Sequence, residues 1–299
     1  MRIAYIISAY KYPQQLVRLL RRLETPRSVF VVHVDAKTAA HVYDEMVDGA
    51  RAVARVHFLD RHTCHWGGFG HVRASLKGID HLIATGIPFD YAVLFTGQDY
   101  PLRPPGEIER FLSDAQGQSF MNHWPLPFPP WGPRGGLDRV EHWHVIGYRR
   151  LHLALPLGRR IPGGLRPFGG GTYWCLARRA VAYVHEFVKQ NPSYVRFFEH
   201  VFIPDEIFFQ TIIMNSPLQE TIVNNNLRYI DWSREPAPAV LTVDDYDKLV
   251  NSGKLFARKF DTTVDLRILD MLDEYIEGQV RVYRRDATAA PGVGGVDAD

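Results

Sequence analysis

Apolar and polar positions follow two different patterns along the first third of the chain. Continuous apolar runs, typical of strands covered on both faces, occupy residues 2–8, 29–34, 53–58 and 91–95. Aliphatic residues recur at helical spacing in segments 14–23 and 69–83. Strands that alternate with helices predict an α/β fold whose central sheet is mostly parallel and flanked by helices.

The regular pattern is interrupted at residues 121–136, which are rich in proline, glycine and tryptophan. Proline removes ladder donors and breaks helices, so this segment is expected to be an irregular loop. Such a loop either packs its own aromatic rings or binds substrate, since tryptophan faces stack well on sugar rings. Because loops of this length in compact domains are usually functional or disordered, and aromatic residues disfavour disorder, we favour a substrate loop.

The second half of the chain predicts a further set of elements. These are a glycine turn into a strand at 169–176, helices at 178–189, from Pro204 and at 263–276, and a strand at 227–230. A capped helix is expected between Thr242, which forms a capping box with Asp245, and Gly253. Residues 284–299 have low hydrophobicity and are expected to be a disordered tail, leaving one domain over residues 1–283.

Composition narrows the function classes. The 299 residues carry 35 basic and 33 acidic side chains, a net charge of +2 without a basic stripe, which argues against a nucleic-acid partner. No apolar run approaches the ~20 residues of a membrane-spanning helix. Cys64 and Cys175 are isolated and form no disulfide framework. We therefore expect a cytoplasmic protein, with any membrane contact limited to peripheral association at the inner face.

Metal and nucleophile motifs are weak. The HWH stretch (142–144) and the HTCH stretch (62–65) each offer ligands but lack a third at a familiar spacing. Asp245 and Asp247 form a D-x-D pattern in the first turns of a predicted helix, where acidic residues favour the helix dipole. No nucleophile elbow, P-loop or dinucleotide fingerprint occurs. The sequence therefore predicts no metal and no cofactor, and a metal-dependent transferase using the D-x-D pair remains an alternative.

Polar segments follow the predicted strands at 8–12, 33–37, 65–70 and 96–102. In open α/β sheets ligands bind beyond the carboxyl ends of the strands, so these segments predict a nucleotide site. Two charged pairs lie on apolar frames further along, Asp205–Glu206 after a proline and Arg258–Lys259 between phenylalanines. Helix capping and a snorkelling lysine explain them simply. A desolvated general base and a fixed charge for a leaving phosphate are the functional alternatives.

Seven motifs in order then give a resemblance that covers roughly residues 2–275. They are HVDAK (33–37), WGG (66–68), TGQDYPL (96–102), GGTYWCL (170–176), PDEIFFQT (204–211), NLRYIDW (226–232) and LFARKFD (255–261). This series resembles the core-2/I-branching β-1,6-N-acetylglucosaminyltransferase family, and within it the peptide O-xylosyltransferase branch.

The resemblance implies a GT-A-type fold and an inverting, metal-independent transfer from a UDP-sugar. It implies that Glu206 is the catalytic base, that Lys259 contacts the diphosphate, and that Asp35 belongs to the uridine site. Gly97 stands where a metal-using enzyme would carry the first aspartate of its D-x-D, so Asp99 lacks its partner. The family's second diphosphate cation is missing near Ala239, and Arg234 or Arg258 would have to replace it.

The expected site combines residues from the polar segments after the strands, which form a rim, with residues that the resemblance implies. Donor binding is assigned to Ser8, Tyr10, Asp35, Trp66, Gln98, Asp99, Arg234, Arg258 and Lys259. Acceptor binding is assigned to Glu141, Trp143, Trp174, Asp205 and Trp232, and the tryptophans are equally compatible with a place in the core. The expected activity moves xylose, N-acetylglucosamine or glucuronate from UDP to a glycan hydroxyl. A non-catalytic sugar- or nucleotide-binding protein on the same fold is the alternative.

Overall fold

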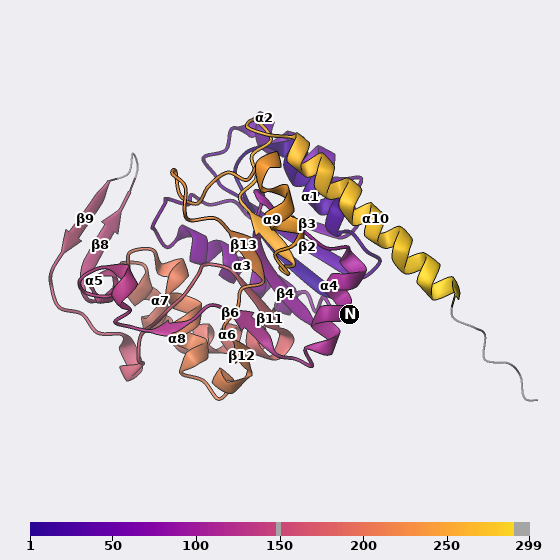
Figure 1. Cartoon of the computed structure of the whole chain (residues 1–299). Coiled ribbons are helices and arrows are strands. Elements are labelled where there is room, and N and C mark those ends of the chain that lie inside the picture. Colours follow the sequence, from indigo (N-terminus) through magenta and orange to yellow (C-terminus); the bar gives the residue numbers. More distant parts are fainter. Residues whose placement is uncertain (148–150, 290–299) are drawn as a thin grey trace, which may run out of the picture.

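The computed structural model describes residues 1–147 and 151–289, and a seven-stranded sheet lies at its centre (Figure 1). The strand order is β12 (Ile222–Val223), β6 (Ser119–Met121), β11 (Trp174–Ala177), β4 (Tyr91–Thr96), β1 (Ile3–Ala9), β2 (Ser28–Val34) and β3 (Val56–Phe58). Strand β11 is antiparallel to β4 and β6, and the other neighbours are parallel. The predicted α/β class with a mostly parallel sheet is confirmed.

Helices cover both faces of this sheet. They are α1 (Pro13–Leu23), α2 (Ala40–Ala50), α3 (Gly70–Ala84), α4 (Pro105–Asp114), α5 (Leu137–Glu141), α6 (Arg178–Gln190), α7 (Pro192–Phe198), α8 (Phe208–Met214), α9 (Tyr246–Val250) and α10 (Arg267–Ala289). Successive β1 residues enter different cores: Tyr5 packs with α1 and α10, whereas Ile6 packs with α3 and α6. The uninterrupted apolar pattern of β1 reflects this burial on both faces.

Smaller elements complete the fold. A three-stranded sheet joins β13 (Arg228–Ile230), β14 (Phe256–Arg258) and β5 (Asp99–Pro101), with β14 in the middle. Two hairpin-like pairs are β7 (Trp124–Pro125) with β10 (Phe168–Gly169), and β8 (Trp143–Ile146) with β9 (His152–Leu155). Short 3₁₀ turns are η1 (Pro129–Trp131), η3 (Pro162–Gly164), η4 (Pro204–Glu206), η5 (Gln219–Thr221) and η6 (Val243–Asp245). The three-stranded sheet pairs β14, the last strand of the described chain, with β5, which follows β4 closely in the sequence.

Several local predictions are confirmed, and others change. Segment 121–136 is largely irregular and packs its own rings, with Trp124 stacked on Phe128 at 4.4 Å between centroids. The capping box between Thr242 and Asp245 is present, and Gly253 has a φ of 68°. The helix expected from Pro204 is broken at Ile207, whose φ of −134° separates η4 from α8.

The C-terminal helix differs in extent from its prediction. Helix α10 begins at Arg267, later than expected, and continues through residues 284–289 of the predicted tail. Residues 290–299 lie outside the described part of the chain. Both cysteines are buried free thiols. In residues 1–147 and 151–289 no helix combines the length and apolar character needed to cross a bilayer.

Candidate active site

The polar segments after β1, β2 and β4 meet at one edge of the sheet. Ser8 is in register with His33 on one side and with Thr96 on the other. Just beyond, the Asp35 amide donates to the Ala9 carbonyl (3.0 Å), and the Gly97 amide donates to the Ser8 carbonyl (2.9 Å). The rim predicted from the strand ends is therefore formed, and it brings together the predicted donor residues Ser8, Asp35 and Gln98.

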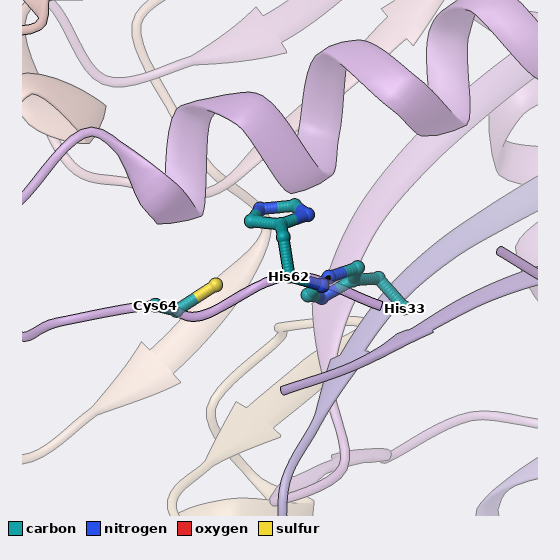
Figure 2. Close-up of side chains that lie close together, drawn as sticks. All are labelled: His33, His62 and Cys64. Carbon is teal, nitrogen blue, oxygen red and sulfur yellow. Dashed lines mark hydrogen bonds between the residues drawn. The ribbon is translucent and has the colours of Figure 1, made fainter. Parts of the chain in front are cut away.

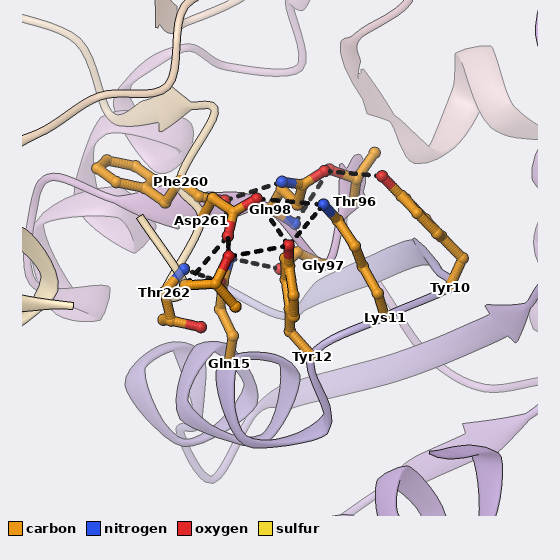
Figure 3. A network of polar contacts seen from close by, with 11 residues as sticks. Tyr10, Lys11, Tyr12, Gln15, Thr96, Gly97, Gln98, Phe260, Asp261 and Thr262 are labelled. Carbon is orange, nitrogen blue, oxygen red and sulfur yellow. Dashed lines mark hydrogen bonds and ion pairs between the residues drawn. The ribbon is translucent and has the colours of Figure 1, made fainter. Parts of the chain in front are cut away.

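The segment after β14 is fastened to this rim by a buried polar network (Figure 3). The Phe260 amide donates to the Gln98 carbonyl (2.8 Å), and the Gln98 side chain donates back to the Phe260 carbonyl (3.0 Å). Gln15, from α1, donates to the Gly97 and Phe260 carbonyls and accepts from the Thr262 amide. The Tyr10 hydroxyl contacts the Gln98 amide oxygen at 3.3 Å. These bonds place the residue before Phe260, Lys259, beside the strand ends.

Lys259 carries a positive charge that the described residues do not neutralise by a hydrogen bond or ion pair to its Nζ. Burial, together with the Arg258 and Lys11 charges, lowers the pKa of Lys259. Lys11 lies in the segment after β1 and binds Asp261 (3.2 Å) and the Tyr12 hydroxyl (2.8 Å). In the sequence, Lys11 is marked only by its place in the polar segment 8–12, and its pairing with Asp261 across 250 residues becomes visible only in the fold.

Arg258 and Asp99 belong to a buried layer beneath this surface. Asp99 is fully buried, and one of its oxygens accepts the Thr96 amide at 2.9 Å. The Arg258 Nε lies 3.7 Å from one Asp99 oxygen, and the Arg228 Nε lies 3.6 Å from the other. The expectation that Asp99 contacts the donor is corrected: a carboxylate with 0% exposure between two arginines supports the site from below.

Arg234 is engaged by two carboxylates. Its guanidinium donates to Asp231 (2.7 Å) and to Asp245 (2.8 Å). Asp245, with 1% of its side chain exposed, also accepts the Thr242 amide as part of the helix cap. The structure thus uses Asp245 as a capping residue and pairs Arg234 with it, so neither presents a free group for a diphosphate or a metal.

Glu206 ends the short turn η4 and has 23% of its side chain exposed. Its Oε2 accepts a hydrogen bond of 2.8 Å from Nη1 of Arg139 on α5. Burial raises the pKa of Glu206 to about 7 and the Asp205 carboxylate adds to the rise, while Arg139 opposes it. A carboxyl group with such a pKa exchanges protons efficiently near neutral pH.

Arg139 is a site residue that no sequence motif marks. The face of Trp131, in the irregular loop, lies 4.0 Å from the Arg139 guanidinium carbon and holds it against Glu206. Gly136 and Gly169 make room for this ring, because a Cβ at either position would come within 2.6 Å of it. The aromatic loop 121–136 therefore acts on the site through Arg139.

The turn at residues 170–174, called the GTYW turn below, contacts both the Asp205–Glu206 pair and Arg258. The Thr172 hydroxyl donates to Asp205 at 2.9 Å. The ring of the next residue, Tyr173, lies 4.5 Å from the Arg258 guanidinium carbon and packs also on Arg228. The Gly170 amide donates to the Glu206 carbonyl (2.8 Å), and a Cβ at Gly170 would overlap the Asn122 carbonyl at 1.8 Å. One tight turn thus sets Glu206 and Arg258 in a common frame.

A second connection runs through the segment His62–Gly68. The Lys37 ammonium donates to Asp35 (2.7 Å) and to the Cys64 carbonyl. Burial opposes ionisation of Asp35, but its hydrogen bonds with Lys37 outweigh that effect and lower its pKa. At the other end of the segment the Gly67 carbonyl accepts the Ile203 amide at 2.8 Å, three residues before Glu206. Asp35 and Glu206 are therefore tied to the same loop.

The predicted acceptor tryptophans fall into two groups. Trp66, Trp143 and Trp232 are exposed by 74%, 38% and 64%. Trp232 lines a polar cavity of about 390 Å³ with Asn122, Lys254 and three consecutive asparagines, 224–226. Trp174 has 0% exposure and packs against Phe209, so of the two places left open for it the structure shows the core and not the acceptor cleft.

The remaining acceptor predictions lie near Arg139. Glu141 ends α5 and forms an ion pair with Arg134, while Trp143 on β8 stacks with Arg159 at 4.1 Å. Asp205 is engaged by Thr172. A partly buried carboxyl group with a pKa near neutrality and the cations that follow β14 lie on either side of one turn, near the edge of a mostly parallel sheet. These features are those expected of the site of an α/β group-transfer enzyme.

Comparison with known sequences makes this class specific. Residues 3–249 match the Core-2/I-Branching enzyme family, and the chain belongs to that family of glycosyltransferases. The match confirms the resemblance found in the seven motifs. Rat xylosyltransferase 2 is 30% identical over 298 residues, and human xylosyltransferase 1 is 26% identical over 303 residues. Each alignment covers 93% of this chain, but the chain spans only about a third of the length of these curated relatives.

Solved structures give a weaker comparison. TarS of S. aureus (residues 1–349, in complex with UDP) is 14% identical and aligns over 64% of this chain and 49% of that chain, with a TM-score of 0.33. A 4-diphosphocytidyl-2C-methyl-D-erythritol synthase from Anaerococcus prevotii has a TM-score of 0.34 at 7% identity, over 64% of this chain and 75% of that chain. Scores this low place no residue of the site.

Proposed function

We propose that this chain is an inverting, metal-independent glycosyltransferase that uses a UDP-sugar, with Glu206 as its general base. The observation that carries the proposal is the Glu206–Arg139 pair, in which burial raises the pKa of the carboxyl group to about 7 beside a solvent-accessible face. A base must accept a proton from a hydroxyl group at working pH, and this environment favours that exchange.

The transfer follows from the two ends of the site. Glu206 removes the proton of an acceptor hydroxyl as its oxygen attacks the anomeric carbon of the donor. The bond from that carbon to the diphosphate oxygen breaks, its electron pair leaves with UDP, and the configuration inverts in this single displacement. Lys259, with Lys11 beside it, stabilises the charge that develops on the diphosphate. Arg258 extends the positive field from the buried layer below.

The donor and acceptor are assigned by class. Asp35 and Gln98, with Ser8 and Tyr10, surround the carboxyl ends of the strands, where a uridine nucleotide binds in open α/β sheets. Xylose, N-acetylglucosamine and glucuronate are the candidate sugars, and the names of the two xylosyltransferase relatives favour xylose. The exposed Trp232 and its asparagine-lined cavity support a glycan acceptor.

Metal independence is part of the proposal. Gly97 occupies the position of the first D-x-D aspartate implied by the family resemblance, Asp99 is buried between arginines, and Asp245 caps a helix. A lysine charge in place of a metal is consistent with all three observations. We expect transfer to proceed without added Mn²⁺ or Mg²⁺, and a rate that falls on chelation and returns with Mn²⁺ would contradict this part.

The substitution Glu206→Gln tests the base. It preserves the size of the side chain and still allows a hydrogen bond with Arg139, so folding should be retained. We expect the rate of sugar transfer to fall by about 10²–10⁴-fold, the contribution of a positioned base, with UDP affinity unchanged. Transfer at a near wild-type rate by the folded variant would refute the assignment. UDP binding without transfer or slow donor hydrolysis in the wild type would instead favour the non-catalytic sugar- or nucleotide-binding protein.

A further inference from the structure

Three side chains of the metal-ligating type meet where β2 ends and the loop before α3 begins. They are His33, His62 and Cys64, whose ligand atoms all lie within 4.8 Å of one another. His33 and Cys64 are 1% and 7% exposed. Figure 2 shows the sulfur of Cys64 directed toward the two imidazole rings. Within the HTCH stretch, His62 and Cys64 meet His33 of β2, and His65 is not part of the group.

The hydrogen bonds of His62 leave one ring nitrogen available. Nε2 of His62 lies 2.9 Å from the Gly70 carbonyl oxygen, which can only accept, so this nitrogen carries the proton. Nδ1 then holds a lone pair, and it is buried without a hydrogen-bond partner in the described structure. A histidine that donates one ring nitrogen to a backbone carbonyl and keeps the other free has the arrangement found in metal sites.

His33 and Cys64 complete the set. Nε2 of His33 accepts the His62 amide at 3.1 Å, a single contact that a bound ion would replace. His33 is buried at the end of β2, and the neutral form of its imidazole is the form that binds a metal ion. Cys64 is a buried free thiol, and it would release its proton when it coordinates the cation.

We propose that His33, His62 and Cys64 bind one transition-metal ion of the Zn²⁺ class. Two imidazoles and a thiolate suit zinc and its borderline-soft neighbours, whereas Mg²⁺, Ca²⁺ and Mn²⁺ prefer oxygen ligands. Bonds of about 2.0–2.3 Å in a tetrahedron place ligand atoms roughly 3.3–3.6 Å apart. Side-chain rotations that contract the trio by about 1 Å therefore suffice, and water would take the fourth position.

This site is separate from Lys259 and Lys11, the cations proposed to bind the diphosphate, but hydrogen bonds connect it to both sides of the active site. The Cys64 carbonyl accepts Lys37, which also holds Asp35. The carbonyl of Gly67, three residues after Cys64, accepts a hydrogen bond from the Ile203 amide, which lies just before the turn η4 that ends at Glu206. An ion bound by His62 and Cys64 would anchor this loop to β2, so it should stabilise the fold and the donor side of the site without taking part in the displacement.

The experiment uses the full chain freed of metal with a chelator and titrated with ZnCl₂ by calorimetry, and with CoCl₂ by absorbance. We expect one Zn²⁺ per chain, a rise in Tm, and a thiolate-to-cobalt charge-transfer band. Cys64→Ser should abolish that band. Cys64→Ser and His62→Gln should each weaken Zn²⁺ binding by more than about 100-fold, since loss of an outer partner alone costs roughly 10–100-fold.

Matched controls come from similar residues elsewhere. His57→Gln alters another pair of neighbouring histidines, His57 and His81, whose rings lie 5.0 Å apart, and Cys175→Ser alters the buried thiol of β11. Both should retain Zn²⁺ affinity and the cobalt band. Absence of stoichiometric binding, or binding that survives both Cys64→Ser and His62→Gln, would overturn the site. A wild-type chain that binds Zn²⁺ but transfers no sugar would count against the proposed function and leave the metal site standing.

Discussion

Arg139 offers the sharpest test of how the structure tunes Glu206. The 2.8 Å bond between Arg139 and Glu206 favours the ionised carboxylate, whereas burial and Asp205 favour the protonated form. Replacing Arg139 by methionine keeps an unbranched side chain against Trp131 and removes the charge. A hydrogen bond to a charged group is worth about 1.5–3 kcal/mol, and one pKa unit corresponds to about 1.36 kcal/mol. The pKa of Glu206 should therefore rise by about one to two further units.

The assay is the pH profile of kcat/KM for sugar transfer. Because the base must be ionised, the wild-type rate should fall below about pH 7. In Arg139→Met this limb should move to higher pH by one to two units. The variant's kcat/KM should therefore be far below the wild-type value near pH 7 and closer to it at alkaline pH. Arg139→Lys keeps the charge and should restore most of the wild-type profile. Arg51→Met removes an arginine whose ion pair with Asp48 is largely exposed, and should leave the profile unchanged.

Stability gives an independent reading of the same pair. The pKa of Glu206 is higher in the folded state than its ordinary value of 4.5, so the folded protein binds the extra proton. The free energy of unfolding should therefore decline as pH rises from about 4.5 to 7. In Arg139→Met the decline should extend to higher pH. A folded variant whose rate profile and stability profile both match the wild type would refute the account of Glu206.

Three further predictions address the rest of the site. Lys259→Met should lower kcat by about 10²–10³-fold, as loss of a group that stabilises transition-state charge does, and Lys259→Arg should recover part of the loss; a folded methionine variant within threefold of wild type would exclude the diphosphate role. Asp99→Asn should lower the free energy of unfolding in urea by about 3–5 kcal/mol, because Arg228 and Arg258 would lose their buried counter-charge, and a loss below 1 kcal/mol would contradict that pairing. Gly169→Ala, whose Cβ would lie 2.6 Å from Trp131, should cost about 1–3 kcal/mol by overpacking, whereas Gly106→Ala, with open space around it, should cost nothing measurable by the same denaturation assay.

The parts of the fold that are set by local pattern were predictable from the sequence. The apolar runs identified β1, β2 and β4, and the helical periods identified α1 and α3, because burial on one or both faces leaves a direct trace in residue order. The sequence did not predict α2, whose exposed surface is extensive, and it predicted an unbroken helix where Ile207 separates η4 from α8. Propensity alone could not show that break, since tertiary contacts of η4 decide it.

The site divides in the same way. The motifs indicated Glu206 and Lys259, and they remain proposals that the geometry supports. Arg139, Lys11 and His33 required the fold, because each meets its partner from a distant part of the chain: Arg139 contacts a carboxylate 67 residues away. Asp99 and Trp174 show the opposite problem, since a polar or aromatic residue in a motif carries no mark of its burial. Their 0% exposure reveals a structural role for each.

Two short segments, the GTYW turn and the loop from His62 to Gly68, affect how the sugar specificity of the site can be changed. The GTYW turn holds Asp205 and Arg258, and the loop from His62 to Gly68 touches both the Asp35 and the Ile203 segments. A substitution chosen to admit a different sugar would therefore also shift Glu206, and a substitution near Glu206 would shift the donor side. Pairs of such substitutions should show strong epistasis. Libraries that vary the donor and acceptor sides together, with Gly67 and Gly170 kept fixed, are better suited to this scaffold than single-site scans.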